Sequence, residues 1–120
     1  ALWDLGLKPG TAVRSLADCV QACREDVTTL TALTEARLLA GSPAVLDALE
    51  DALRSEGLWP AADYFDAKRA EWNGRHARYN DTANNLEPNL KEGPGGLRDL
   101  HTLTWLARRL YRVPGLEALV

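Results

Sequence analysis

A chain of 120 residues can form one modest domain or part of a larger one, and its 46% hydrophobic and 26% charged residues are typical of a soluble globular protein. A net charge of −3 argues against non-specific binding to nucleic acid or to an anionic membrane, since both require a basic surface. No apolar run approaches the roughly 18 residues of a membrane span, and the first ten residues lack the pattern of a signal peptide. We therefore expect neither nucleic acid nor a membrane as a partner.

The first residues, 2–7, alternate between apolar and small or acidic side chains, and a Lys-Pro-Gly-Thr turn follows at 8–11. Period-two alternation before a turn predicts a β-strand, and a single strand must pair with others to be stable. Because the chain does not begin with Met, we expect it to be an internal piece of a longer protein, with the rest of the sheet before Ala1. Asp4 lies in this strand and could bind Mg²⁺, although an exposed or capping role explains it equally well.

The next part of the chain predicts a long helix over 16–40. Ser15 is a suitable N-cap, and Asp18 completes an approximate capping box. Apolar residues then recur at helical spacing until Gly41, with a bend or interruption expected near 25–27.

Further helices are predicted from start and stop signals. Ser42-Pro43 begins one that ends at Gly57, and Trp59-Pro60 begins another that Asn80-Asp81 breaks. A last helix runs from about 96 to 111, before Pro114-Gly115. The prediction is therefore a mainly α chain in which one N-terminal strand completes an α/β sheet and a helical bundle follows.

Within the helix after Pro60, aromatic residues at 65, 72, 76 and 79 form a stripe that we expect to be core. The cations Lys68, Arg69, Arg75 and Arg78 are expected to form a solvated face, with the rim of an anionic site as the alternative.

Cys19 and Cys23 share one helix face at i, i+4 spacing, where a disulfide would be strained. We interpret them as small buried apolar residues in a reduced, cytoplasmic protein. His76 and His101 lack a nucleophile or metal-binding motif around them, and we expect structural roles for both.

The stretch 85–103 is rich in glycine and proline and leads directly into the last helix. Gly93, Gly95 and Gly96 would let the backbone approach a ligand, and unpaired N–H groups at a helix start attract anions. Lys91 and Arg98 flank these glycines and suit phosphate oxygens. The stretch therefore predicts either a phosphate-binding loop or a loop that only caps the helix.

Residues 85–100, NLEPNLKEGPGGLRDL, are similar to the signature segment of the bacterial PII uridylyltransferase/uridylyl-removing enzyme family. Segments 2–7, 13–16, 35–41 and 75–79 also resemble the course of that family, in the same order. A related loop occurs in glutamine synthetase adenylyltransferase, which is the near alternative.

The resemblance implies a polymerase-β-type nucleotidyltransferase, with 1–14 as the last part of its sheet and 15–120 as the helical region that contains the loop 85–99. That family transfers UMP from UTP to a tyrosine of the PII signalling protein with Mg²⁺ or Mn²⁺. It implies that Asp4 is the third metal-binding carboxylate, with the other two before Ala1 and the HD and ACT domains after Val120. Lys91, Gly93, Gly95, Gly96 and Arg98 would then face the triphosphate or the domain junction.

Two consequences remain open. Because two metal carboxylates are missing, we expect this chain by itself to be inactive as a uridylyltransferase. A non-catalytic helical module that docks a protein partner is the alternative of a different class.

Overall fold

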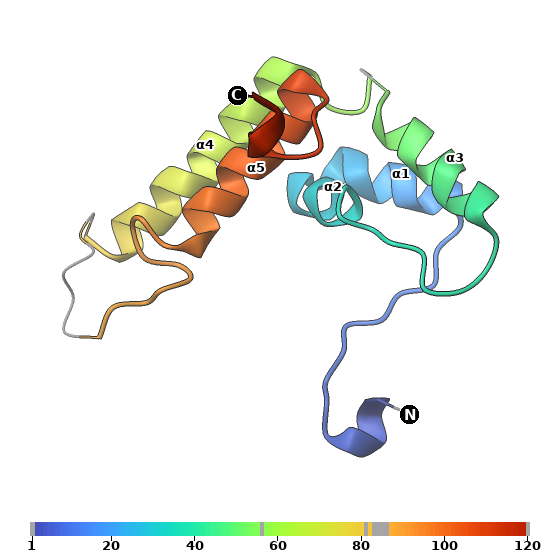
Figure 1. Ribbon diagram of the computed structural model, residues 1–120, viewed down its shortest axis with the longest axis horizontal. Coiled ribbons are helices and arrows are strands. Elements are labelled where there is room, and N and C mark those ends of the chain that lie inside the picture. The colour runs from blue at the N-terminus through green and yellow to red at the C-terminus, as the bar shows by residue number, and fades with distance from the viewer. Residues whose placement is uncertain (1, 56, 81, 83–86, 120) are drawn as a thin grey trace.

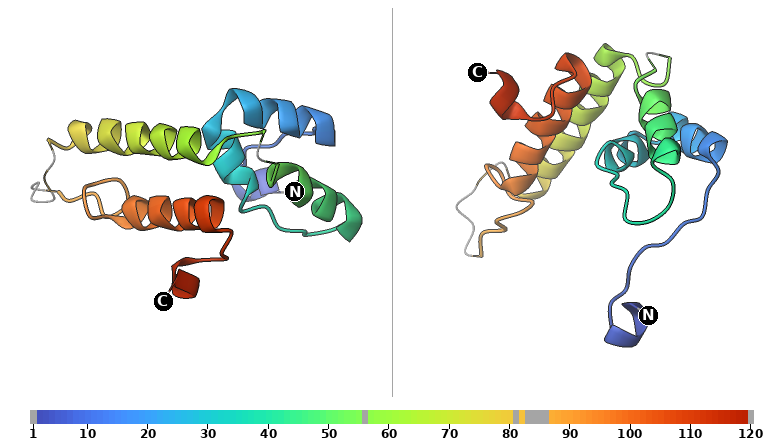
Figure 2. Two further views of the ribbon diagram at one scale, coloured as in Figure 1. Left: turned by 90° about the horizontal axis from the view of Figure 1, so that it is seen from above. Right: turned by 45° about the vertical axis from the view of Figure 1, so that its right-hand side comes forward.

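The computed structural model describes residues 2–55, 57–80, 82 and 87–119, which are almost entirely helical (Figure 1). Two groups of helices lie side by side: three shorter helices form one group, and two long antiparallel helices form the other (Figures 1 and 2). The elements are η1 (Leu2–Leu5), α1 (Leu16–Glu25), α2 (Val27–Leu33), α3 (Pro43–Leu53), α4 (Ala61–Arg78), α5 (Leu97–Tyr111) and η2 (Leu116–Leu119).

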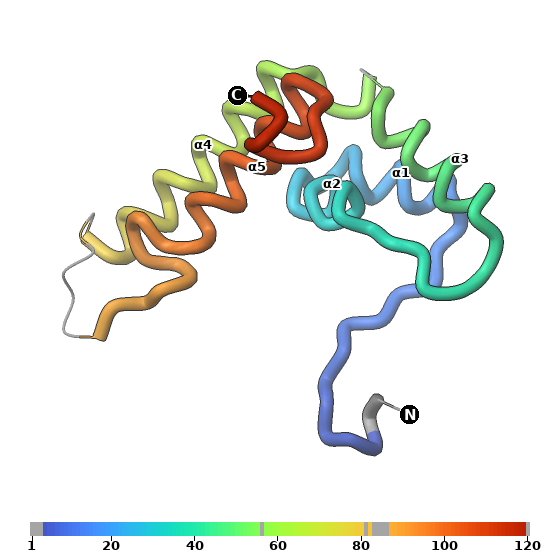
Figure 3. Tube along the Cα trace, in the orientation of Figure 1, coloured from blue at the N-terminus to red at the C-terminus, as the bar shows by residue number. Residues whose placement is uncertain are grey.

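The predicted N-terminal strand is not present among the described residues. Leu2–Leu5 form a 3₁₀ turn instead, and Gly6 ends it with a left-handed φ of 72°. An extended segment then leads to α1 and holds η1 apart from the helices (Figures 1 and 3). The physical reason is pairing: a strand is stable only beside another strand, and no described residue offers one.

The predicted start of α1 and its interruption are both confirmed. The Ser15 hydroxyl accepts the Asp18 N–H at 3.2 Å, and the Asp18 carboxylate accepts the Ser15 N–H at 3.2 Å, which completes the capping box. Asp26 breaks the helix, because its backbone is extended and its carboxylate caps α2 by accepting the N–H groups of Thr28 and Thr29, each at 2.9 Å.

The helix does not continue to Ala40 as predicted. It ends at Leu33, where i→i+3 bonds from the N–H groups of Glu35 and Ala36 tighten the last turn and lead out of the helix. The later helices agree with the prediction except at one end: α3 begins at Pro43 as predicted but ends at Leu53 and not at Gly57. Helix α4 ends at Arg78 before Asn80 with a φ of 53°, and α5 ends at Tyr111.

The core lies where α1, α2, α3 and the start of α4 meet. Its buried apolar members are Cys23, Leu30, Leu53, Leu58 and Tyr64. The burial predicted for the cysteines is confirmed for Cys23, which is fully buried, whereas Cys19 is partly buried; both are free thiols. Burial also raises the pKa of the Cys23 thiol, as expected for a structural cysteine.

Helix α4 follows the predicted division into an aromatic core face and a charged solvent face only in part. His76 is buried and Arg69 and Arg78 are exposed, as predicted. Phe65 and Trp72 are 40% and 37% exposed, whereas Lys68 and Arg75 are only 2% and 5% exposed. The cations are buried because they have partners: Lys68 Nζ contacts Glu71 Oε2 at 2.8 Å, and Arg75 pairs with Asp99. A charged side chain can be buried when an opposite charge and hydrogen bonds replace its water.

Among the described helices, none combines the length and apolar character that crossing a membrane requires.

Candidate functional site at the glycine-rich loop

The glycine-rich loop, residues 89–98, connects the end of α4 to α5 and is closed on itself. The Asn89 side-chain oxygen accepts the N–H groups of Lys91 and Glu92 at 3.0 and 2.9 Å, which starts the first turn. At the neck, the Leu97 N–H donates to the Leu90 carbonyl at 2.9 Å and the Arg98 N–H donates to the Lys91 carbonyl at 2.8 Å. Asn89 also donates to the Tyr79 hydroxyl at 3.1 Å, which ties the loop to α4.

Three glycines are required by the backbone of this loop, and at Gly93 an added Cβ would lie 2.8 Å from the Asn89 carbonyl oxygen. Gly95 has a φ of 75°, a left-handed conformation that other residues rarely adopt. At Gly96, an added Cβ would lie 2.8 Å from the carbonyl oxygens of both Gly93 and Leu90. Gly93 is buried in the first turn, where its N–H donates to the Asn89 carbonyl at 2.9 Å.

The N–H groups from Lys91 to Arg98 are all used inside the molecule. Besides the bonds already described, the Gly96 N–H donates to the Gly93 carbonyl at 2.9 Å, and the Gly95 N–H donates to the Asp99 carboxylate at 2.8 Å. Pro94 has no N–H group to offer. In this conformation, an anion would therefore meet the side chains of Lys91 and Arg98, not the backbone amides.

The two cationic side chains of the loop differ in their surroundings. Lys91 is exposed. The Arg98 guanidinium donates through Nη2 to Glu92 Oε1 at 3.0 Å and lies over the Trp105 ring at 5.5 Å. That bond from Arg98 is the main reason why the pKa of the Glu92 carboxyl lies below its usual value.

Asp99, in the first turn of α5, joins the loop to α4. Its carboxylate accepts the Gly95 N–H at 2.8 Å, His76 Nε2 at 3.0 Å and Arg75 Nη2. A carboxylate can only accept here, so His76 carries a proton on Nε2. Burial works to raise the pKa of the Asp99 carboxyl, but the bonds from Gly95, Arg75 and His76 outweigh it, and the pKa is lowered.

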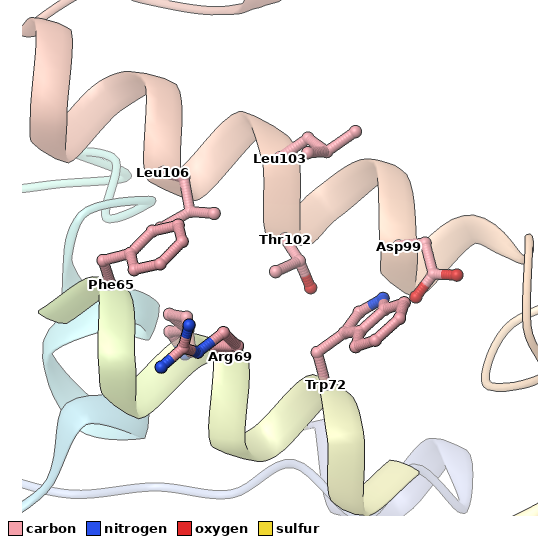
Figure 4. A pocket seen from close by; sticks show the side chains of 8 residues that line it. Phe65, Arg69, Trp72, Asp99, Thr102, Leu103 and Leu106 are labelled. Carbon is pink, nitrogen blue, oxygen red and sulfur yellow. The ribbon is translucent and has the colours of Figure 1, made fainter. Parts of the chain in front are cut away.

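A cavity of about 400 Å³ lies beside this junction, between α4 and α5 (Figure 4). Phe65 and Trp72 reach into it from α4 and Leu106 from α5, and Leu103 also lines it. Trp72 also lies against the His76 ring, with 3.8 Å between ring centroids, so the wall of the cavity contacts the group that holds Asp99. The surface of the cavity is mainly apolar, with Asp99 at its loop end.

Asp4 is not brought together with the loop. It is exposed and lies in η1, which is well separated in space from the glycine-rich loop (Figure 1). Among the described residues, no three His, Cys, Asp or Glu side chains lie close enough to hold a metal ion. Asp4 alone supplies too few oxygen ligands, so the described residues do not fit Mg²⁺ or Mn²⁺ without carboxylates from elsewhere.

The sequence did not predict that Arg75 and Asp99 form a pair. They are separated by 24 positions, and Arg75 was placed on a solvated face. The sequence did contain a signal for this pair. Arg75 and His76 lie in the last turn of α4 and an acidic residue lies in the first turn of α5, and an antiparallel helical hairpin brings these two turns together.

Comparison with known proteins agrees with the resemblance. The family model described as GlnD PII-uridylyltransferase matches residues 63–120, which include α4, the loop and α5. The chain is 50% identical over 119 residues to the bifunctional uridylyltransferase/uridylyl-removing enzyme of Methylococcus capsulatus, covering 99% of this chain and 14% of that protein. The same enzymes of Hydrogenovibrio crunogenus and Azotobacter vinelandii are 49% and 47% identical, with 99% of this chain and 13% of each relative covered.

No solved structure matches the chain significantly. The chain spans only about 14% of the length of the curated relatives that it matches. The names of these relatives favour the uridylyltransferase over the adenylyltransferase alternative. With a family-model match over the α4–loop–α5 hairpin and about half of all residues identical along the chain, this chain belongs, as a segment, to the GlnD PII-uridylyltransferase family.

Proposed function

We propose that this chain is part of a nucleotidyltransferase that transfers UMP from UTP to a tyrosine of the PII signalling protein. The observation that carries the proposal is the 50% identity over 99% of the chain to a bifunctional uridylyltransferase/uridylyl-removing enzyme. The reaction would use Mg²⁺ or Mn²⁺, with UTP and PII as partners in the cytoplasm.

Within that reaction, the chain would supply positively charged side chains held in position for the phosphates. Lys91 would meet phosphate oxygens as an exposed point charge, and Arg98 would offer a planar fork after exchanging its Glu92 partner for phosphate. Both groups would stabilise negative charge on the departing pyrophosphate. Gly93, Gly95 and Gly96 would serve them by allowing the closed backbone of the loop. Asp4 would supply one metal-binding carboxylate next to others outside this chain, and the metal would polarise the phosphate oxygens.

The test is UMP transfer from radiolabelled UTP to PII by the full-length protein. Asp4→Asn should abolish transfer while the circular dichroism spectrum and thermal midpoint stay unchanged. Lys91→Ala and Arg98→Ala should weaken UTP binding, each by about tenfold, the factor expected from one charge-assisted hydrogen bond. Arg54→Ala is a matched control, because Arg54 is exposed at the end of α3 and its ion pairs among the described residues are local ones with Glu50 and Asp51.

Wild-type rates in Asp4→Asn would contradict the role of Asp4. If the two loop variants change only the thermal midpoint, the loop is a structural cap and does not contact the nucleotide.

A second candidate function is that of a non-catalytic module that docks a protein partner. The observation that favours it is a stripe of exposed leucines on α5, with Leu97, Leu100 and Leu103 each between 52% and 53% exposed. Calorimetry of the chain by itself with UTP and Mg²⁺ separates the two functions, because a docking module would show no heat of nucleotide binding.

A further inference from the structure

We propose that Asp99 is a positioning residue that fixes the glycine-rich loop on α4 and so places Lys91 and Arg98 for the phosphates of UTP. The inference rests on the proposed function and adds a residue that does not itself touch the nucleotide.

The first step of the argument is the connection that Asp99 makes. One of its oxygens accepts the Gly95 N–H from the sharpest point of the loop, at 2.8 Å. The same carboxylate holds two side chains from the last turn of α4, His76 at 3.0 Å and Arg75. Because these donors come from two different elements, the carboxylate is the group through which the turn at Gly95 is attached to α4.

The second step is that the α4 side of this connection is rigid. Arg75 and His76 are 5% and 7% exposed, and Trp72 lies against the His76 ring. Among the described residues, the buried Arg75 Nε has no hydrogen-bond partner, which makes the bond from Nη2 to Asp99 more important for holding the guanidinium. A buried ion pair is costly to break from one side, which makes it suited to holding a fixed geometry.

The third step links the connection to the two cations. The neck of the loop is closed by the Arg98 N–H, which donates to the Lys91 carbonyl at 2.8 Å. Gly95 lies between these residues at a left-handed φ of 75°, and its N–H donates to the Asp99 carboxylate at 2.8 Å. Releasing Gly95 from Asp99 would loosen the attachment of the loop to α4, so Lys91 and Arg98, which the bond between their backbones keeps together, would vary in position relative to α4. Charges at a variable position bind a triphosphate less well, because they must be ordered on binding.

The experiment uses the full-length protein with Asp99→Asn, which keeps the size of the side chain and one acceptor oxygen but removes the charge. Its matched control is Asp66→Asn, which removes the same charge from an exposed pair with Arg69 on α4. Gly95→Ala is a second variant that strains the turn while leaving Asp99, Arg75 and His76 intact, and no atom lies within 4 Å of the added Cβ. It keeps the test valid if Asp99→Asn does not fold.

For Asp99→Asn and Gly95→Ala, we expect the KM for UTP to rise about tenfold with kcat changed less than about twofold, the pattern of lost substrate positioning. Hydrogen–deuterium exchange of the peptide that covers 90–98 should become faster by at least about tenfold in both variants. Asp66→Asn should leave both readouts at wild-type values.

Unchanged KM and unchanged exchange in Asp99→Asn would overturn the positioning role while leaving the proposed function intact. Faster exchange with wild-type KM would also overturn it, because the loop would then be held by Asp99 for stability only. If the wild-type protein transfers no UMP at all, the proposed function itself fails, together with the phosphate-placing part of this inference.

Discussion

Arg109 Nη1 donates to the carbonyl oxygen of Leu53 at 2.6 Å, and this bond joins the end of α5 to the end of α3. The same guanidinium reaches the carbonyls of Ser55 and Trp59 in the connection between α3 and α4. Leu53 is the last residue of α3, where carbonyls lose their helical partners, so Arg109 caps a helix end and joins the two groups of helices.

Arg109→Ala should therefore lower the free energy of unfolding of the chain by about 2–3 kcal/mol, since hydrogen bonds from a charged group are lost and the Leu53 and Trp59 carbonyls lose this donor. Chemical denaturation followed by circular dichroism measures this loss. Arg54→Ala is the control and should change stability by less than about 0.5 kcal/mol, because its ion pairs are exposed. An equal effect of the two substitutions would refute the structural role of Arg109.

The ring and the hydroxyl of Tyr64 should contribute different amounts to the free energy of unfolding. It is 1% exposed, and its hydroxyl lies 3.1 Å from Thr31 Oγ1, which also donates to the Val27 carbonyl at 2.7 Å. Tyr64→Phe should cost about 1 kcal/mol, because Thr31 keeps a partner, whereas Tyr64→Ala should cost about 3–5 kcal/mol through the cavity it leaves. Denaturation midpoints of the two variants test this order, and a similar loss in both would contradict it.

Two glycine-to-alanine changes should have opposite signs. Gly96→Ala should destabilise the chain by about 1–3 kcal/mol, because its Cβ would lie 2.8 Å from two carbonyl oxygens. Gly74 lies inside α4, with no atom within 4 Å of an added Cβ, so Gly74→Ala should stabilise the chain by about 0.5–1 kcal/mol. Thermal unfolding of the pair provides the measurement. A destabilising Gly74→Ala would show that α4 is less regular than described.

Asp26 should make stability depend on pH. Its pKa is lowered, first by the Thr29 side chain and then by the N–H groups at the start of α2. A carboxyl with a lowered folded-state pKa stabilises the fold fully above its unfolded pKa of about 4, and this contribution is lost as the pH falls through the lower folded value.

Asp26→Ala should consequently cost about 1 kcal/mol at pH 7, a usual value for an N-cap, and less at pH 3. Urea denaturation at both pH values gives the comparison. A cost that grows at pH 3 would show that the protonated side chain, not the carboxylate, caps α2.

Local signals in the sequence were enough to place most helix boundaries. The capping box of Ser15 and Asp18, the interruption near Asp26 and the start at Pro43 all lie where they were expected. Each of these depends on bonds or backbone constraints within about four residues, so the information is contained in the neighbouring sequence.

The strand predicted for the first residues shows the limit of local information. Its alternation is real, but strand formation depends on a partner strand, and among the described residues Leu2–Leu5 form a 3₁₀ turn. In the same way, the sequence indicated that the glycines of the loop are important, but not why. The left-handed φ at Gly95 and the close carbonyls at Gly96 are seen only in the tertiary structure.

The sequence by itself determined the helices, their caps and the family to which this chain belongs. Only the tertiary structure decided which charges are buried, because Arg75 is held by Asp99 across 24 positions and Lys68 lies under the Trp105 ring at 5.1 Å. Burial of a charge depends on groups that replace its water, and the Asp99 carboxylate for Arg75 and the Trp105 ring for Lys68 are brought close only when α4 and α5 pack against each other.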